Sequence, residues 1–112
     1  MRYAAIDIGS NAVRLLIADI IRNTSTVSFK KNTLVRVPLR LGDDAFIDHR
    51  ISPSKAVDLI KTMTAFRNLM DVYKVSRYMA CATSAMREAA NGDELTEAIR
   101  GAGIDPRIID GK

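Results

Sequence analysis

The chain has 112 residues, of which 47% are hydrophobic, enough for one domain with a buried core. Its formal net charge is +4, and its single cysteine, Cys81, excludes a disulfide within the chain. No apolar run is long enough to cross a bilayer, and Met1 leads directly into a strand pattern instead of a signal peptide. We therefore expect one domain over residues 1–112, located in the reducing cytoplasm, with no membrane partner.

The first structural feature is a polar turn between two apolar runs. Residues 3–8 and 13–17 are apolar apart from Asp7 and Arg14, and Gly9-Ser10-Asn11 lies between them. This pattern predicts strand, tight turn and strand. Gly, Ser and Asn tolerate positive φ and expose backbone N–H groups, which suits a loop around a phosphate. Asp7, expected to be buried in its strand, is either the anchor of a Mg²⁺ ion on that phosphate or a structural acid that caps its own turn.

The next segment, between Asp19 and Asp43, is basic and contains no acid. Its charged residues are Arg22, Lys30, Lys31, Arg36 and Arg40. Such a segment attracts polyanions, or it is simply the solvated face of a hairpin. Its only aromatic residue is Phe29, so it lacks the stacking platform that single-stranded nucleic acid needs, and no nucleic-acid partner is expected.

The remaining pattern predicts a third strand up to Pro38, a loop over residues 40–50 with a solvated His49, and a helix of about five turns capped by Ser52. A strand over residues 78–82, expected to be buried on both faces, leads into a short helix from residue 83. A helix capped by Asp93 and a strand starting at residue 107 follow. The order predicts an α/β fold with a mixed sheet of about five strands, three of them in a meander before helix crossovers, and helices packed on the sheet.

A second group of polar residues follows the strand at 78–82. Thr83 and Ser84 stand at a helix N-terminus, where free N–H groups favour an anion, and Arg87 offers a bidentate phosphate donor one turn later. The alternative is that Thr83 or Ser84 only caps the helix while Arg87 pairs with a surface acid such as Asp93.

A rival enzyme class uses two of these residues. Cys81 and Arg87 have the C-x₅-R spacing of cysteine-dependent phosphatases, which hold phosphate in a loop around a thiolate. The intervening residues contain no glycine, however, and Glu88 follows the arginine. We expect Cys81 to point into the core instead.

Four motifs together resemble the exopolyphosphatase and guanosine pentaphosphate phosphohydrolase family. They are Asp7-Ile8-Gly9-Ser10-Asn11 with Arg14, Arg40-Leu41-Gly42, residues 82–91, and Ile108-Ile109-Asp110-Gly111. The resemblance implies an N-terminal lobe of the actin-like ATPase fold, which is ribonuclease H-like. It also implies that Asp7 lies near Mg²⁺ and that the residues contacting phosphate are Gly9, Ser10, Asn11, Arg14, Thr83, Ser84, Arg87 and Asn91.

The same resemblance implies a reaction and partners. The substrate would be polyphosphate or guanosine pentaphosphate, hydrolysed at a terminal phosphoanhydride bond, with the general-base glutamate and a C-terminal lobe expected beyond Lys112. We therefore expect a truncated N-terminal lobe that is inactive alone and covers its exposed apolar surface by forming a homo-oligomer. The alternative is a non-catalytic lobe of an actin-like or sugar-kinase type protein that binds nucleotide or polyphosphate.

Overall fold

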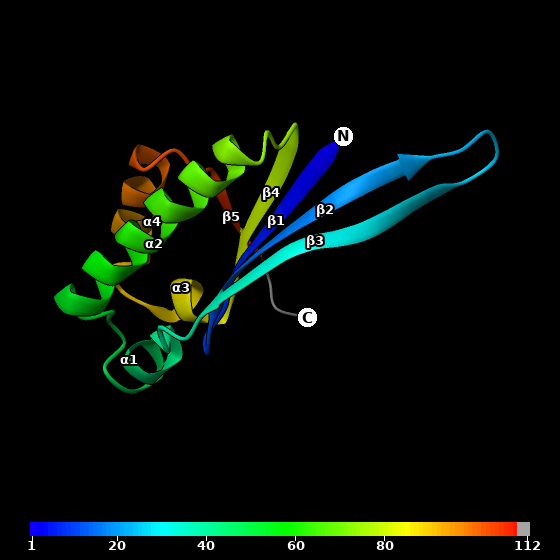
Figure 1. The fold of residues 1–112 in the computed structure, drawn as a ribbon. Helices are drawn as coiled ribbons and strands as arrows, with labels where there is room; N and C mark the ends of the chain where they lie inside the picture. Colours follow the sequence, from blue (N-terminus) through cyan, green and yellow to red (C-terminus); the bar gives the residue numbers. More distant parts are fainter. Residues whose placement is uncertain (110–112) are drawn as a thin grey trace.

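The chain forms one mixed sheet with helices on a single face (Figure 1). The computed structural model describes residues 1–109. Over those residues the strands are β1 (Arg2–Ile8), β2 (Val13–Arg22), β3 (Val27–Val37), β4 (Arg77–Ala82) and β5 (Pro106–Ile108). They lie in the order β3-β2-β1-β4-β5, with the first three antiparallel and β1, β4 and β5 parallel. The predicted α/β fold, a three-strand meander followed by helix crossovers, is confirmed.

The helices cover the sheet face toward which every second strand residue points. They are α1 (Leu41–Ile47), α2 (Pro53–Val72), α3 (Ser84–Glu88) and α4 (Gly92–Gly101). In β1 the side chains of Ala4, Ile6 and Ile8 are buried against them, whereas Ala5 and Asp7 are exposed on the opposite face. We call this opposite side the open face, because no helix of residues 1–109 packs on it.

Helix α2 forms as its sequence predicts. Ser52 is the N-cap, its hydroxyl accepts the Lys55 N–H at 3.4 Å, and Pro53 occupies the first turn, where a missing N–H is harmless. The core side of the helix consists of residues at helical spacing that are at most 1% exposed: Leu59, Met63, Phe66 and Met70.

Helix α1 replaces the loop predicted over residues 40–50. It starts after Arg40, whose φ of 55° and ψ of 49° place it in the left-handed region. The Asp44 carboxylate accepts the Ser52 N–H at 2.9 Å and pairs with Lys55 Nζ at 3.1 Å. The Ser52 backbone bond, followed by the Ser52 hydroxyl and Lys55, lowers the pKa of Asp44 below its usual value. These contacts come from outside the helix, which explains why local sequence did not reveal it.

The sequence predicted that strand β4 is buried on both faces, but in the structure only one of its faces is buried. Ala80 and Ala82 face the helices, whereas Cys81 is half-buried on the open face and Met79 is 61% exposed there. The expectation that Cys81 points into the core is therefore wrong, because strand alternation already gives that side to the two alanines. Helix α4 also starts two residues earlier than predicted, with Asn91 instead of Asp93 as its N-cap residue.

The β2–β3 hairpin extends beyond the rest of the sheet and gives the molecule its long dimension, with extents of 52 × 29 × 20 Å (Figure 1). Its outer half is solvated, with Val27 and Phe29 58% and 69% exposed. No helix within residues 1–109 is both long and apolar enough to span a membrane.

Candidate functional site

The turn after β1 is closed by its own backbone. The Gly9 N–H donates to the Ala12 carbonyl at 3.1 Å, and a Cβ on Gly9 would lie only 2.9 Å from that oxygen. Glycine is therefore needed for space. Positive φ, the reason expected from sequence, does not occur at residues 9–11.

The two predicted phosphate segments meet at one edge of the sheet. Strands β1 and β4 are parallel neighbours, so their carboxyl ends lie side by side. The Thr83 N–H donates to the Ile8 carbonyl at 3.3 Å, and the Ser10 and Ser84 hydroxyl oxygens are 3.3 Å apart. Residues 74 positions apart in the chain thus place two rotatable hydroxyls at one point.

Asp7 lies beside this point on the open face, exposed instead of buried as predicted. Both of its carboxylate oxygens are 3.8 Å from the position that a Gly9 Cβ would take, so the carboxylate lies over the turn. Arg14 is its cross-strand partner in β2, but within residues 1–109 no ion pair to Asp7 forms within 4 Å. Among these residues the carboxylate has no cationic partner.

A magnesium ion fits Asp7 only together with a phosphate ligand. The described part of the chain contains no cluster of three metal-ligating side chains. Mg²⁺ does not need such a cluster, because it commonly keeps several waters and takes one or two carboxylates plus substrate phosphates. An exposed single carboxylate next to the turn that was predicted to bind phosphate is compatible with that requirement.

Arg87 leaves α3 on the same side as Ser84. Its guanidinium donates to the Ile109 carbonyl at 2.6 Å and is exposed, and it does not pair with Asp93, the acid considered as an alternative. One hydrogen bond to a neutral carbonyl uses one of five donors, and Arg87 forms no ion pair with any acid within residues 1–109. Asp110 and Gly111, the end of the last motif, lie outside the described residues.

Asn91 has a different role from the expected phosphate contact. Its side chain is 7% exposed, its Oδ1 accepts the Ile51 N–H at 3.0 Å, and its Nδ2 donates to the Ile51 carbonyl at 2.9 Å. Both ends of the amide are thus used to hold the α1–α2 connection against the start of α4. We leave Asn91 out of the proposed site.

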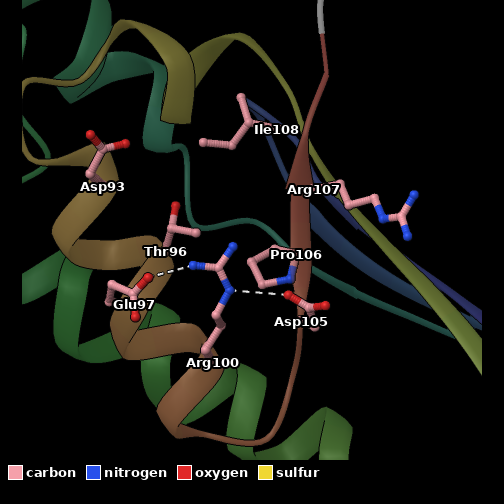
Figure 2. Close-up of a pocket in the computed structure, with 8 residues that line it drawn as sticks. All are labelled: Asp93, Thr96, Glu97, Arg100, Asp105, Pro106, Arg107 and Ile108. Atoms are coloured by element: carbon pink, nitrogen blue, oxygen red, sulfur yellow. Dashed lines mark hydrogen bonds and ion pairs between the residues drawn. The ribbon is translucent and has the colours of Figure 1, made fainter.

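A hollow of about 490 Å³ lies elsewhere, between α4 and β5 (Figure 2). Three acids line it, and Arg100 within it is already bonded to Asp105 and Glu97, which, in that order, raise the pKa of Arg100. Figure 2 shows Arg107 pointing away from α4. The hollow is therefore poorly suited to a polyanion, in contrast to the turn after β1.

A smaller hollow of about 220 Å³ adjoins that turn, and although Asn11 and Arg40 belong to motifs named above, no hollow was predicted there. Asn11, Arg36, Pro38 and Arg40 line it, and we call it the arginine hollow. The acid-free basic segment signalled the charge, but only the folded chain shows that Arg36 and Arg40 come to the edge of the phosphate turn.

Comparison with known proteins shows which family the chain belongs to. A model of the Ppx/GppA phosphatase family matches residues 13–112. The chain belongs to this family. The crystal structure of the type II variant of the Aquifex aeolicus Ppx/GppA phosphatase superposes with a TM-score of 0.89 at 31% identity, covering 100% of this chain and 36% of that one. The actin-like ATPase fold class expected from the motifs is thereby confirmed.

Sequence relatives give the same assignment. Exopolyphosphatase 1 of Mycobacterium leprae is 30% identical over 100 residues, which cover 89% of this chain and 29% of that protein. The bifunctional 3-dehydroquinate synthase/phosphatase of Fusobacterium nucleatum is 31% identical over 93 residues, which cover 80% of this chain and 14% of that protein. The chain thus spans a minor part, from 14% to 36%, of the relatives considered.

Proposed function

We propose that this chain is the phosphate-binding lobe of a Mg²⁺-dependent exopolyphosphatase or guanosine pentaphosphate phosphohydrolase, which hydrolyses terminal phosphoanhydride bonds. The observation that carries the proposal is the 3.3 Å approach of the Ser10 and Ser84 hydroxyls at the shared end of β1 and β4. Membership of the phosphatase family and the similarity to an exopolyphosphatase support the choice of reaction.

The chain's own residues would bind and orient the terminal phosphoryl group. The two serine hydroxyls rotate to donate to phosphate oxygens, and the Arg87 fork can take a pair of them. Phosphoryl transfer depends mainly on positioning and charge stabilisation, so such fixed donors are what this reaction requires from a protein. The Ile109 carbonyl limits the orientations of Arg87.

Asp7 is the residue that would hold magnesium. When bound, the ion would neutralise phosphate charge in the site. The position of Asp7, next to Gly9 and on the open face, allows its carboxylate to reach an ion bound to phosphates at the turn.

Binding without hydrolysis is the activity expected of the chain by itself. In-line attack needs groups on both sides of the phosphoryl and a water opposite the leaving oxygen. The convergent groups described here lie at one edge of one sheet, so they supply one side of that arrangement.

Calorimetry of the 112-residue chain with tripolyphosphate and Mg²⁺ tests the proposal. We expect Ser84→Ala or Arg87→Ala to weaken binding about tenfold or more, the scale of losing a hydrogen bond to a charged group. The matched controls are Ser54→Ala in the first turn of α2 and Arg77→Ala at the opposite end of β4, which should bind like the unaltered chain. Equal effects of site and control substitutions would contradict the proposed site.

Metal dependence is tested in the same titration. Asp7→Asn should remove the gain in tripolyphosphate affinity that Mg²⁺ gives, while leaving binding in the presence of a chelator unchanged. Asp7 is exposed, so this substitution should not alter thermal unfolding. A magnesium effect that persists in Asp7→Asn would exclude Asp7 as the metal ligand.

A further inference from the structure

The arginine hollow shares its wall with the proposed phosphate turn. The Arg40 N–H donates to the Asn11 carbonyl at 3.0 Å, and the Gly42 N–H donates to the Ser10 carbonyl at 2.9 Å. The loop between β3 and α1 is thus bonded to the turn at two successive residues. Asn11 lines the hollow while its neighbour Ser10 meets Ser84, so the hollow and the serine site lie on two sides of one short turn.

The arginines around the hollow form no ion pair among the described residues, although Asp7 is the other cross-strand neighbour of Arg14. Arg36 in β3 and Arg14 in β2 are cross-strand partners, an arrangement that is destabilising for like charges. Within the described residues, no acid lies within 4 Å of the cationic groups of Arg14, Arg36 or Arg40. Arg2, Arg67 and Arg100 do have acidic partners, but Arg22, Arg50 and Arg77 form no ion pair among the described residues either. What distinguishes Arg36 and Arg40 is that both line one hollow.

The backbone at Arg40 is also held in an unfavourable conformation. Its φ of 55° lies in the left-handed region, which residues other than glycine, asparagine and aspartate seldom adopt. The Arg40 carbonyl accepts from Lys55 Nζ at 2.8 Å and from the Asp43 N–H at 3.1 Å, which fixes it there. Strained residues that the surroundings hold in place concentrate at ligand sites, and here the strain places a guanidinium beside the hollow.

From these observations we propose that the arginine hollow is a second phosphate subsite. It would hold phosphates further along an oligophosphate chain whose terminal phosphate lies between Ser10 and Ser84. The strand order places α3 on the β4 side of the turn and the hollow on the β3 side, so the phosphate chain would run across the end of the sheet over Asn11. This inference rests on the proposed function.

The subsite predicts a dependence on phosphate chain length. The test compares orthophosphate, tripolyphosphate and a longer polyphosphate by calorimetry on the 112-residue chain, with the double variant Arg36→Gln/Arg40→Asn. Asparagine suits the left-handed conformation and glutamine suits a strand edge, so the backbone should be retained. We expect a loss of about tenfold or more for the longer polyphosphate and less than about twofold for orthophosphate.

The matched control removes two charges from the far end of the same hairpin. Arg22→Gln/Lys30→Gln changes the net charge equally, but both residues lie away from the turn. Thermal unfolding of both double variants checks that each is folded, and the single variant Arg36→Gln replaces the double variant if that one is not. Equal losses for both double variants, or equal losses for all three ligands, would overturn the subsite.

The outcomes also separate this inference from the proposed function. If Ser84→Ala weakens orthophosphate binding while the arginine double variant binds every chain length normally, the serine site stands and the subsite is refuted. If the arginine variant loses polyphosphate while Ser84→Ala has no effect, the hollow binds phosphate and the serine site is refuted. Absence of binding to all three ligands by the unaltered chain would refute both.

Discussion

Gly92 begins α4 directly against the end of α3, and replacing it by alanine should destabilise the fold strongly. A Cβ at this position would lie 2.1 Å from the Met86 carbonyl oxygen and 3.3 Å from its carbonyl carbon. Met86 is 1% exposed, and its carbonyl belongs to the backbone of α3, so no flexible side chain can move to relieve the contact.

The expected loss of stability in Gly92→Ala follows from the distance that the Met86 carbonyl would have to move. Real contacts of a Cβ essentially never fall below 3.0 Å, so the Met86 carbonyl would have to retreat by about 1 Å inside a packed interior. Overpacking of this kind costs typically about 1–3 kcal/mol, and a rigid backbone neighbour places Gly92→Ala at about 3 kcal/mol. For a chain of this size the corresponding fall in Tm is about 10–20 °C.

Gly101 provides the matched control at the other end of the same helix. No atom lies within 4 Å of the position of its Cβ, so Gly101→Ala adds a methyl group in open space. It should leave stability unchanged or raise it by about 0.5 kcal/mol, since alanine loses less backbone entropy than glycine in a helix. Urea unfolding followed by circular dichroism measures both variants.

Gly92→Ala should also affect the candidate site if the variant still folds. Relief of the contact displaces α3, which carries Ser84 and Arg87, so tripolyphosphate affinity should fall with stability. A Gly92→Ala variant within about 1 kcal/mol of the unaltered chain would refute the argument, because the close approach of α3 and α4 would then be easily relaxed.

Two further predictions concern the α1–α2 connection. Asn91→Ala should lower the free energy of unfolding by about 3 kcal/mol, because it leaves the N–H and carbonyl of fully buried Ile51 without partners. Asn91→Asp should cost at least as much, because it keeps the acceptor but buries a carboxylate whose second oxygen faces the Ile51 carbonyl. Urea unfolding measures both variants. Asp44→Asn should lower stability by about 1 kcal/mol at neutral pH. Because the folded pKa of Asp44 is below its ordinary value of 3.8, this contribution is present above pH 3.8 and is lost as the pH falls through the folded pKa, so unfolding curves of the two proteins should converge in acid.

The sequence predicted well those features that local pattern determines. The cap at Ser52 and the apolar positions of α2 reflect helical spacing, and the meander follows from apolar runs separated by polar turns. The meeting of the turn after β1 with Thr83 and Ser84 also follows, because both come after parallel strands that share an edge.

The wrong predictions concern features that depend on contacts with residues outside the local segment. Helix α1 depends on Asp44 binding Ser52, and the role of Asn91 depends on Ile51, which is 40 positions away. The exposure of Asp7 could have been found, since Ile6 and Ile8 flank it and alternation assigns the other face to Asp7. Alternation alone does not show which face of the sheet the helices cover, and that information is needed to predict that Asp7 is exposed.

Three locally unfavourable or sterically restricted features lie at the same end of the sheet. The turn needs Gly9 for space, Arg40 holds a left-handed conformation, and Arg14 faces Arg36 across two strands without an acid in contact among the described residues. The left-handed conformation of Arg40 and the Arg14–Arg36 pair each cost stability, and the proposed polyanion would offset the repulsion between the arginines. Arg22 and Arg77 also form no ion pair among the described residues, so what distinguishes Arg36 and Arg40 is that both line one hollow beside the turn.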